Sequence, residues 1–199
     1  MFVKICGLCS GEDAAAAADL GADALGFVFW KPSKRFVTAG DVAAWTAGLP
    51  AEILKVGVFV DASPDEIART VNTAKLDVVQ LHGSLKRPSP GIRTWRVVYP
   101  GKTPAFSPAE VDAVILDSYS ESSPGGTGVC CDWDAAARIV ESAEVPVILA
   151  GGLNPENVAV AVARVRPWGV DVSSGVERAI RVKDLAKVKE FILNAKSAG

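Results

Sequence analysis

Two residues of this chain, Cys6 and Asp117, have the chemistry of a proton-transferring pair, because a thiolate accepts a proton and a carboxylic acid donates one. Cys6 follows an apolar run at residues 2–5. Lys4 has the same parity along an extended strand, so its ammonium would favour the thiolate. Asp117 follows the run at residues 113–116, where desolvation would raise its pKa and keep it protonated near neutral pH. The alternative roles are structural: a small buried cysteine and a capping aspartate.

Two loops near the end of the chain have the composition of a phosphate site. Gly151 and Gly152 follow the apolar run at residues 145–150, and Ser173, Ser174 and Gly175 follow the run at residues 168–172. Backbone N–H groups of such loops bind phosphate, commonly with a short extra helix, for which residues 175–180 are the candidate. A third loop, residues 125–128, contains Gly126 and could also approach a ligand through its backbone. Ordinary tight turns are the alternative.

Basic and imidazole groups follow two other apolar runs. Residues 31–35 contain three cations, and Arg35 could hold a substrate carboxylate through two parallel hydrogen bonds, unless the segment is simply a solvated loop. His82 ends the run at residues 78–81 and is a candidate substrate contact, or a residue that only bonds a loop. As the sole histidine, it excludes a multi-histidine metal centre.

The cysteines offer two further kinds of chemistry, and we expect neither. Cys6 and Cys9 form a CxxC pair, but that redox motif belongs to smaller folds than the one predicted below. Cys130 and Cys131 are adjacent, which is poor spacing for zinc ligands, so we expect no metal. A disulfide between Cys6 and Cys9 would remove the candidate base.

The elements that position these residues follow from a repeated pattern of short, nearly continuous apolar runs, as in strands buried on both faces. Amphipathic helical segments lie between several runs, at residues 10–20, 63–73, 132–142, 157–165 and 182–196. Such alternation indicates a parallel sheet, and eight units favour an α/β fold, the closed (β/α)8 TIM barrel, over an open doubly wound sheet. The runs are Phe2–Ile5, Ala24–Phe29, Ile53–Val60, Val78–Leu81, Ile92–Tyr99, Ala113–Leu116, Val145–Ala150 and Trp168–Val172.

The length of the chain makes this barrel compact. It has 199 residues, whereas such barrels typically have about 250. Residues 84–91 and 101–108 are short and proline-containing, so we expect shortened or missing helices after the fourth and fifth strands. No linker divides the sequence, so we expect a single domain over residues 1–199. The candidate residues all follow strands, and barrel active sites lie at the C-terminal ends of strands.

Composition excludes several classes of protein. Lys and Arg number 21 and Asp and Glu 23, so the net charge of −2 argues against broad binding to nucleic acid or acidic membranes. Hydrophobic residues make up 49%, which excludes a disordered chain. We expect neither a signal peptide nor a membrane span, and four cysteines are too few for a disulfide scaffold, so a cytoplasmic location is expected.

The sequence resembles the phosphoribosylanthranilate isomerase family of tryptophan biosynthesis over nearly its whole length. The matching segments together are far more specific than any one alone. They are residues 4–8, 26–27 with Ser33 and Arg35, 56–59, 79–83, 116–117, 125–128 with 132–133, 149–153 with Pro155 and 157–158, and 169–177 with 183–184.

This resemblance implies a cofactor-free Amadori rearrangement of N-(5-phosphoribosyl)anthranilate to 1-(2-carboxyphenylamino)-1-deoxyribulose 5-phosphate. It implies that Asp117 protonates the furanose ring oxygen, that Cys6 removes the proton from C2′, and that Arg35 holds the anthranilate carboxylate. Backbone groups around residues 151–152 and 174–175 would bind the phosphate. His82 and Gly126 complete the expected substrate contacts. The expected partner is this small phosphosugar alone, and the chain would be a monomer or a homodimer.

The sequence departs from the family pattern in three places. Cys131 replaces a usual phenylalanine, residues 178–181 read Arg-Ala-Ile-Arg where a proline-glycine turn is usual, and the helices after strands four and five look short. Two alternatives to this isomerase stay open. One is another phosphosugar isomerase of the same barrel type, although a histidine-pathway enzyme would be expected to carry aspartate in place of Cys6. The other is a non-catalytic barrel that binds phosphate ligands, which would need neither Cys6 nor Asp117.

Overall fold

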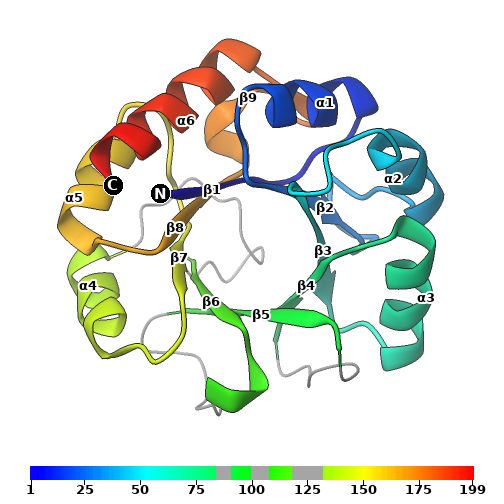
Figure 1. Cartoon of the computed structure of the whole chain (residues 1–199), viewed down its shortest axis with the longest axis horizontal. Coiled ribbons are helices and arrows are strands. Elements are labelled where there is room, and N and C mark those ends of the chain that lie inside the picture. The colour runs from blue at the N-terminus through cyan, green and yellow to red at the C-terminus, as the bar shows by residue number, and fades with distance from the viewer. Residues whose placement is uncertain (84–90, 100–107, 118–131) are drawn as a thin grey trace.

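A computed structural model of the chain describes residues 1–83, 91–99, 108–117 and 132–199. Eight parallel strands form a closed barrel in sequence order, with β8 paired to β1, and the helices lie outside it (Figure 1). The strands are β1 (Phe2–Ile5), β2 (Ala24–Val28), β3 (Leu54–Val60), β4 (Val78–His82), β5 (Arg93–Val98), β6 (Ala113–Leu116), β7 (Val147–Leu149) and β8 (Gly169–Val172). The predicted barrel and all eight of its strands are thereby confirmed.

Six helices surround this barrel in the described ranges. They are α1 (Gly11–Asp19), α2 (Ala39–Thr46), α3 (Pro64–Ala74), α4 (Trp133–Ser142), α5 (Val158–Val165) and α6 (Leu185–Ala198). Side-chain caps begin three of them: Ser10 and Ser63 accept hydrogen bonds from the N3 amides of α1 and α3, and Asp132 accepts from Asp134 N and Ala135 N in α4. None of the helices in these ranges combines the length and apolar character needed to cross a bilayer.

The structure differs from the sequence-based expectations in the last fifth of the chain. Residues 175–180 do not form a helix. A single 3₁₀ turn, Ser174–Val176, leads into β9 (Glu177–Ala179), which pairs antiparallel with β10 (Val182–Lys183). The final helix therefore begins at Leu185, with Asp184 as its cap, and not at Val182. Strand pairing and an ion pair made by Glu177 hold these residues extended, which local helical periodicity could not reveal.

The expected shortening after the fourth and fifth strands falls mostly on residues 84–90 and 100–107, which lie outside the described residues. In the second connection, residues 108–110 form one 3₁₀ turn before β6. Helix α2, in contrast, was missed by the sequence analysis. Its signal is a capping box, in which Thr38 Oγ1 accepts from Asp41 N at 3.2 Å and Asp41 Oδ2 accepts from Thr38 N at 3.4 Å.

Apolar side chains cover both faces of the barrel wall and form two layers, one outside and one inside the ring of strands. Outward-facing strand residues such as Val3, Phe27 and Leu149 pack against the helices. Inward-facing residues, including Val56, Trp95 and Ile115, fill the N-terminal part of the interior. Because side chains alternate along a strand, the interior rows continue into polar residues toward the C-terminal ends. The rows end in the pairs Lys4 and Cys6, Gln80 and His82, Ile115 and Asp117, and Asp171 and Ser173.

Three aspartates in equivalent positions bind strand amides at the opposite, N-terminal end of the barrel. Asp23, Asp77 and Asp112 each stand just before an even-numbered strand, and each carboxylate accepts a backbone N–H from the neighbouring odd-numbered strand. The distances are 2.8 Å from Val3 N, 2.9 Å from Lys55 N and 2.7 Å from Thr94 N. Each carboxylate thus supplies a hydrogen-bond acceptor for a strand N–H group at the end of the barrel.

Replacing Asp23 by alanine should lower the free energy of unfolding by about 1.5–3 kcal/mol, because a charged acceptor is lost from the Val3 amide. Asp23→Asn, which keeps an acceptor oxygen, should lose clearly less. Urea unfolding followed by circular dichroism measures both. Equal losses in the two variants would contradict the role given to this hydrogen bond.

Candidate active site

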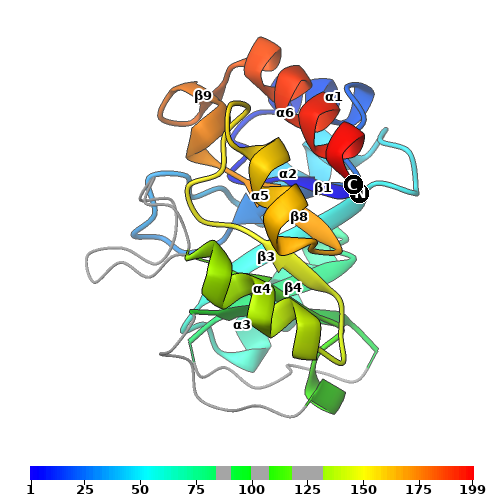
Figure 2. The same ribbon diagram turned by 90° about the vertical axis from the view of Figure 1, so that its left-hand side faces the viewer.

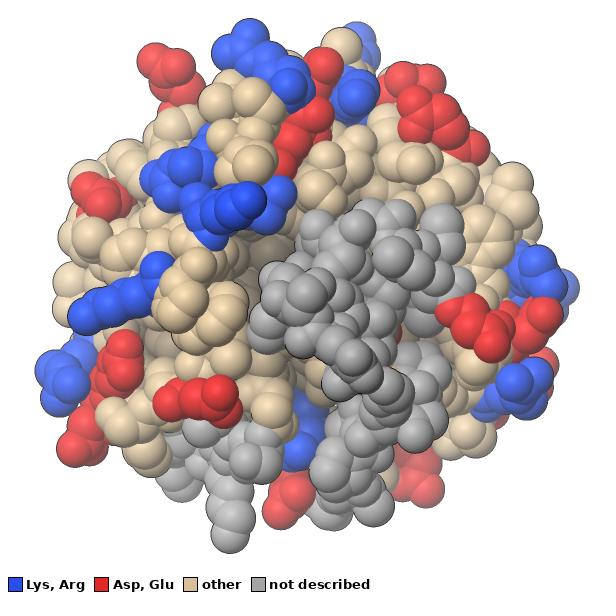
Figure 3. All heavy atoms as spheres, turned by 180° about the vertical axis from the view of Figure 1, so that it is seen from behind, with Lys and Arg blue, Asp and Glu red and all other residues tan. Residues whose placement is uncertain are grey.

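The C-terminal ends of the strands surround a pocket of about 630 Å³. Its walls combine residues that directly follow β1, β2, β6, β7 and β8 with inward-facing residues of β3 and β4. Figure 2 shows the β9 hairpin at this end of the molecule, opposite the two chain termini. Seen from this end, Lys and Arg side chains gather beside the central hollow (Figure 3), a distribution that suits an anionic ligand.

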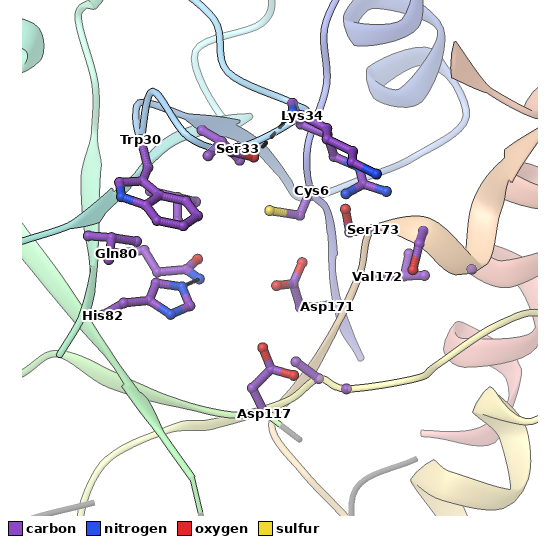
Figure 4. Close-up of a pocket in the computed structure, with 18 of the residues that line it drawn as sticks. Cys6, Trp30, Ser33, Lys34, Gln80, His82, Asp117, Asp171, Val172 and Ser173 are labelled. Atoms are coloured by element: carbon purple, nitrogen blue, oxygen red, sulfur yellow. Dashed lines mark hydrogen bonds between the residues drawn. The ribbon is translucent and has the colours of Figure 1, made fainter. Parts of the chain in front are cut away.

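The structure brings together nearly all of the residues that the sequence singled out. The pocket is lined by Cys6, Arg35, His82, Asp117, Gly151, Gly152, Ser174 and Gly175. Gly126 lies outside the described residues, as do Cys130 and Cys131. In the close-up, Cys6 and Asp117 point into the same space from different strands, with His82 on the opposite wall (Figure 4). A candidate base and a candidate acid therefore face one cavity.

Cys6 is a buried free thiol, and opposing effects act on its pKa. Burial raises the pKa above its ordinary value. The ammonium of Lys4 opposes that shift, while the carboxylate of Asp171 adds to it. The predicted influence of Lys4 is present, since its ammonium favours the thiolate, but desolvation of the buried thiol outweighs it. With its pKa raised, Cys6 is mainly a thiol near neutral pH, and its thiolate is a correspondingly strong base.

Below Cys6, a buried ion pair joins the first and last strands of the barrel. Lys4 Nζ lies 2.9 Å from Asp171 Oδ2, and the two residues are register neighbours on β1 and β8. Lys4 is completely buried and Asp171 is 8% exposed. Gly26 on β2 makes room for this group, since a Cβ there would lie only 2.7 Å from Cys6 Sγ and 3.1 Å from Lys4 Cε. The sequence analysis missed Asp171, although its parity with Ser173 was a usable signal.

Two acceptor atoms on the pocket wall are buried without a hydrogen-bond partner among the described residues. They are Oε1 of Gln80 and Oδ1 of Asp171. An unpaired buried acceptor is costly, so such atoms are rare unless a ligand completes them. Both side chains point into the cavity in Figure 4.

His82 belongs to a buried chain of polar side chains. Its Nε2 lies 3.4 Å from Gln80 Nε2 and its Nδ1 lies 3.0 Å from the hydroxyl of Tyr99. The donor and acceptor roles in this chain depend on the tautomer of the ring. Burial, helped by the charge of Lys4, lowers the pKa of His82 to about 4. The ring is therefore neutral near pH 7 and serves as a hydrogen-bonding wall of the pocket.

Arg35 makes a bidentate ion pair that the sequence did not reveal. Its Nε and Nη2 donate to the two carboxylate oxygens of Glu177, each at 2.6 Å, and Lys183 Nζ lies 3.4 Å from the same carboxylate. Burial would raise the pKa of Glu177, but the hydrogen bonds from Arg35 and the charge of Lys183 hold it below its usual value. Because Glu177 uses one side of the guanidinium, the Nη1 edge is left to meet a ligand.

The glycine loops after β7 and β8 border the other side of the pocket. Gly151 and Gly152 have φ values of 79° and 69°, a left-handed conformation that favours glycine. Gly175 packs so closely that a Cβ would collide with the carbonyl oxygen of Leu153. Asn157 Nδ2 donates to Gly152 O at 3.0 Å and fixes the first loop. Backbone, not side chains, therefore forms this wall, as the composition of the loops predicts.

Comparison with known proteins places this geometry in a family. Residues 3–194 match the family model described as N-(5′-phosphoribosyl)anthranilate (PRA) isomerase. An N-(5′-phosphoribosyl)anthranilate isomerase from Geobacter sulfurreducens is 46% identical over 202 residues, which cover 98% of each chain.

Two solved structures are similar over 99% of each chain, both with a TM-score of 0.83 and 33% identity. One shows monomers of the dimeric phosphoribosylanthranilate isomerase from Thermotoga maritima. The other is a phosphoribosyl anthranilate isomerase in complex with reduced 1-(o-carboxyphenylamino)-1-deoxyribulose 5-phosphate.

The depressed pKa of His82 predicts a pH-dependent stability. Between its unfolded pKa of 6.5 and its folded pKa of about 4, only the unfolded chain binds the proton. The contribution of neutral His82 to the free energy of unfolding is therefore complete above pH 6.5. About 3 kcal/mol of it is lost as the pH falls toward 4. The difference in unfolding free energy between wild type and His82→Gln should change by that amount across this window. A difference that does not vary with pH would contradict the buried, neutral ring.

Proposed function

Because the chain belongs to the N-(5′-phosphoribosyl)anthranilate isomerase family, we propose that Cys6 is the general base and Asp117 the general acid of its reaction. The chain is an isomerase of tryptophan biosynthesis that rearranges N-(5′-phosphoribosyl)anthranilate to 1-(2-carboxyphenylamino)-1-deoxyribulose 5-phosphate. The single observation that carries the assignment of roles is the placement of a buried thiol and a buried carboxyl group, 8% exposed each, in one pocket.

The reaction needs one proton delivered to oxygen and one removed from carbon. Asp117, as the carboxylic acid, protonates the furanose ring oxygen; the C1′–O bond breaks and the nitrogen lone pair forms a C1′=N⁺ iminium. The Cys6 thiolate then takes the proton from C2′, and the electrons of that C–H bond form C1′=C2′ while the C=N electrons return to nitrogen. Transfer of the O2′ proton to C1′ gives the ketose. Atoms and charge balance without a redox partner, so we propose that no cofactor takes part.

The buried thiol suits this step because of its strength as a base. A proton on carbon next to an iminium is only moderately acidic, and a base of raised pKa removes it more readily. The cost is that little thiolate exists at neutral pH. The neighbouring ammonium of Lys4, held 2.9 Å from Asp171, limits that cost by stabilising the charged form.

The two ends of the pocket fit the two anionic groups of the substrate. Arg35, with Glu177 on one edge of its guanidinium, offers its other edge to the anthranilate carboxylate. The backbone loops at residues 151–152 and 174–175 take the phosphate, which anchors the substrate at a distance and orients C2′ toward Cys6. We include Gly126 on the phosphosugar side by resemblance alone, since it lies outside the described residues.

The middle of the substrate matches the unpaired acceptors. An open-chain aminosugar carries several hydroxyls and an N–H group. We propose that the polar side chains of Gln80 and Asp171, which line the pocket, contact these donors, and that His82 forms the adjoining wall. Hydrogen bonds to these acceptors would favour binding of the polyhydroxylated substrate over an apolar molecule of similar size.

We also propose a reducing location, the cytoplasm, because the role of Cys6 requires a free thiol and Cys9 lies only three residues away. For the oligomeric state, the resemblance to the family is the basis: we propose a monomer or a homodimer, and the Thermotoga maritima relative is described as dimeric.

The roles of Cys6 and Asp117 are tested by turnover of freshly generated phosphoribosylanthranilate, followed by loss of its fluorescence without added metal. Cys6→Ala and Asp117→Asn should each lose on the order of 10²-fold or more in kcat. Both should still bind the reduced product analogue, because the anchoring groups remain. Cys9→Ala is the matched control and should keep wild-type turnover. If Cys6→Ala retains activity, or if it loses analogue binding and turnover together, Cys6 is not the base.

A further inference from the structure

The β9–β10 hairpin binds the loop that carries Arg35 at two points, through Glu177 and through Arg181. At its base, Glu177 binds the guanidinium through both carboxylate oxygens at 2.6 Å. At its turn, Arg181 Nη1 donates to Lys34 O and to Phe36 O, each at 3.0 Å. These carbonyls belong to the residues on either side of Arg35. One hairpin thus holds both the side chain of Arg35 and the backbone that flanks it.

The backbone of Arg181 is itself unusual. Its φ is 75°, in the left-handed region that favours glycine. An arginine here is unfavourable for the turn, and its two charge-assisted hydrogen bonds offset that strain. The side chain therefore has a use that glycine could not supply.

The rest of the hairpin is anchored firmly enough to act as a support. Lys183 Nζ donates to Ser173 O at 2.9 Å, and Lys183 N donates to Asp13 Oδ2 at 3.0 Å. Next to Arg181, Ile180 lines the pocket with 53% of its surface exposed, so the turn reaches the cavity where Arg35 lies. A support fixed to α1 and to the end of β8 can hold the loop after β2 in one position.

We propose that Arg181 is a positioning residue for Arg35: it fixes the backbone on both sides of Arg35, so that the free edge of the guanidinium meets the carboxylate of the bound aromatic acid. This inference rests on the proposed function, in which Arg35 binds that carboxylate. The carboxylate does not take part in bond making, so it is held equally in the ground state and the transition state. Loss of Arg181 should therefore raise KM and leave kcat nearly unchanged.

The test uses Arg181→Gly, which removes the side chain and also relieves the left-handed strain, so the variant is expected to fold. Arg178→Ala is the matched control, because it removes the same charge from an exposed position of the same hairpin. Two ligands are compared by calorimetry: the reduced product analogue, and the same molecule without its carboxylate. Arg181→Gly should weaken binding of the first about 3- to 10-fold and of the second not at all. Arg178→Ala should change neither by as much.

Each other outcome overturns the inference in a recognisable way. Equal weakening of both ligands would show that Arg181 acts only on the general shape of the pocket. Unchanged binding of both would show that Arg35 needs no such support. If wild type itself does not distinguish the two ligands, the carboxylate role of Arg35 in the proposed function fails, and this inference fails with it.

Discussion

The buried ion pair between Lys4 and Asp171 is the constraint on which the site depends. It joins side chains of the first and last strands at 2.9 Å, at the seam where β1 and β8 pair, and it lies beneath Cys6. Neither charge could stay so deeply buried alone, and removing one partner of such a pair typically costs about 3–5 kcal/mol. The intact pair contributes little net stability, because the cost of desolvating both ions offsets their attraction. Its effect on the site is to fix two charges and one unpaired acceptor beside the thiol.

The remaining architecture distributes three kinds of recognition around this centre. Strand alternation brings Cys6, Gln80, His82 and Asp117 into one cavity, because each lies on an inward row that is apolar nearer the N-terminal end. Backbone loops after β7 and β8 form one wall, and the hairpin after β8 supports Arg35 on another. Strands thus place the residues proposed to transfer protons, while loops place those proposed to bind the anionic ends of the substrate, a division common to barrel enzymes.

The sequence predicted the strands and the placement of the candidate residues well, because both depend on local pattern: apolar runs, caps, and the residue after each run. It failed where long-range contacts decide. Glu177 keeps residues 177–179 extended by pairing with Arg35, 142 positions away, so the expected helix at 175–180 does not form. Similarly, parity placed Lys4 beside Cys6, but only the closed barrel shows that burial and Asp171 outweigh the ammonium.

The titration of Cys6 shows whether burial raises the pKa of this thiol and whether Lys4 restrains the rise. The rate of alkylation of Cys6, distinguished from Cys9 by peptide fragmentation in mass spectrometry, would be measured against pH in folded wild type and Lys4→Met. We expect a midpoint above the ordinary thiol pKa of about 8.5 in wild type, and a higher midpoint in Lys4→Met. A wild-type midpoint at or below that value, or a midpoint that does not rise in Lys4→Met, would contradict this expectation.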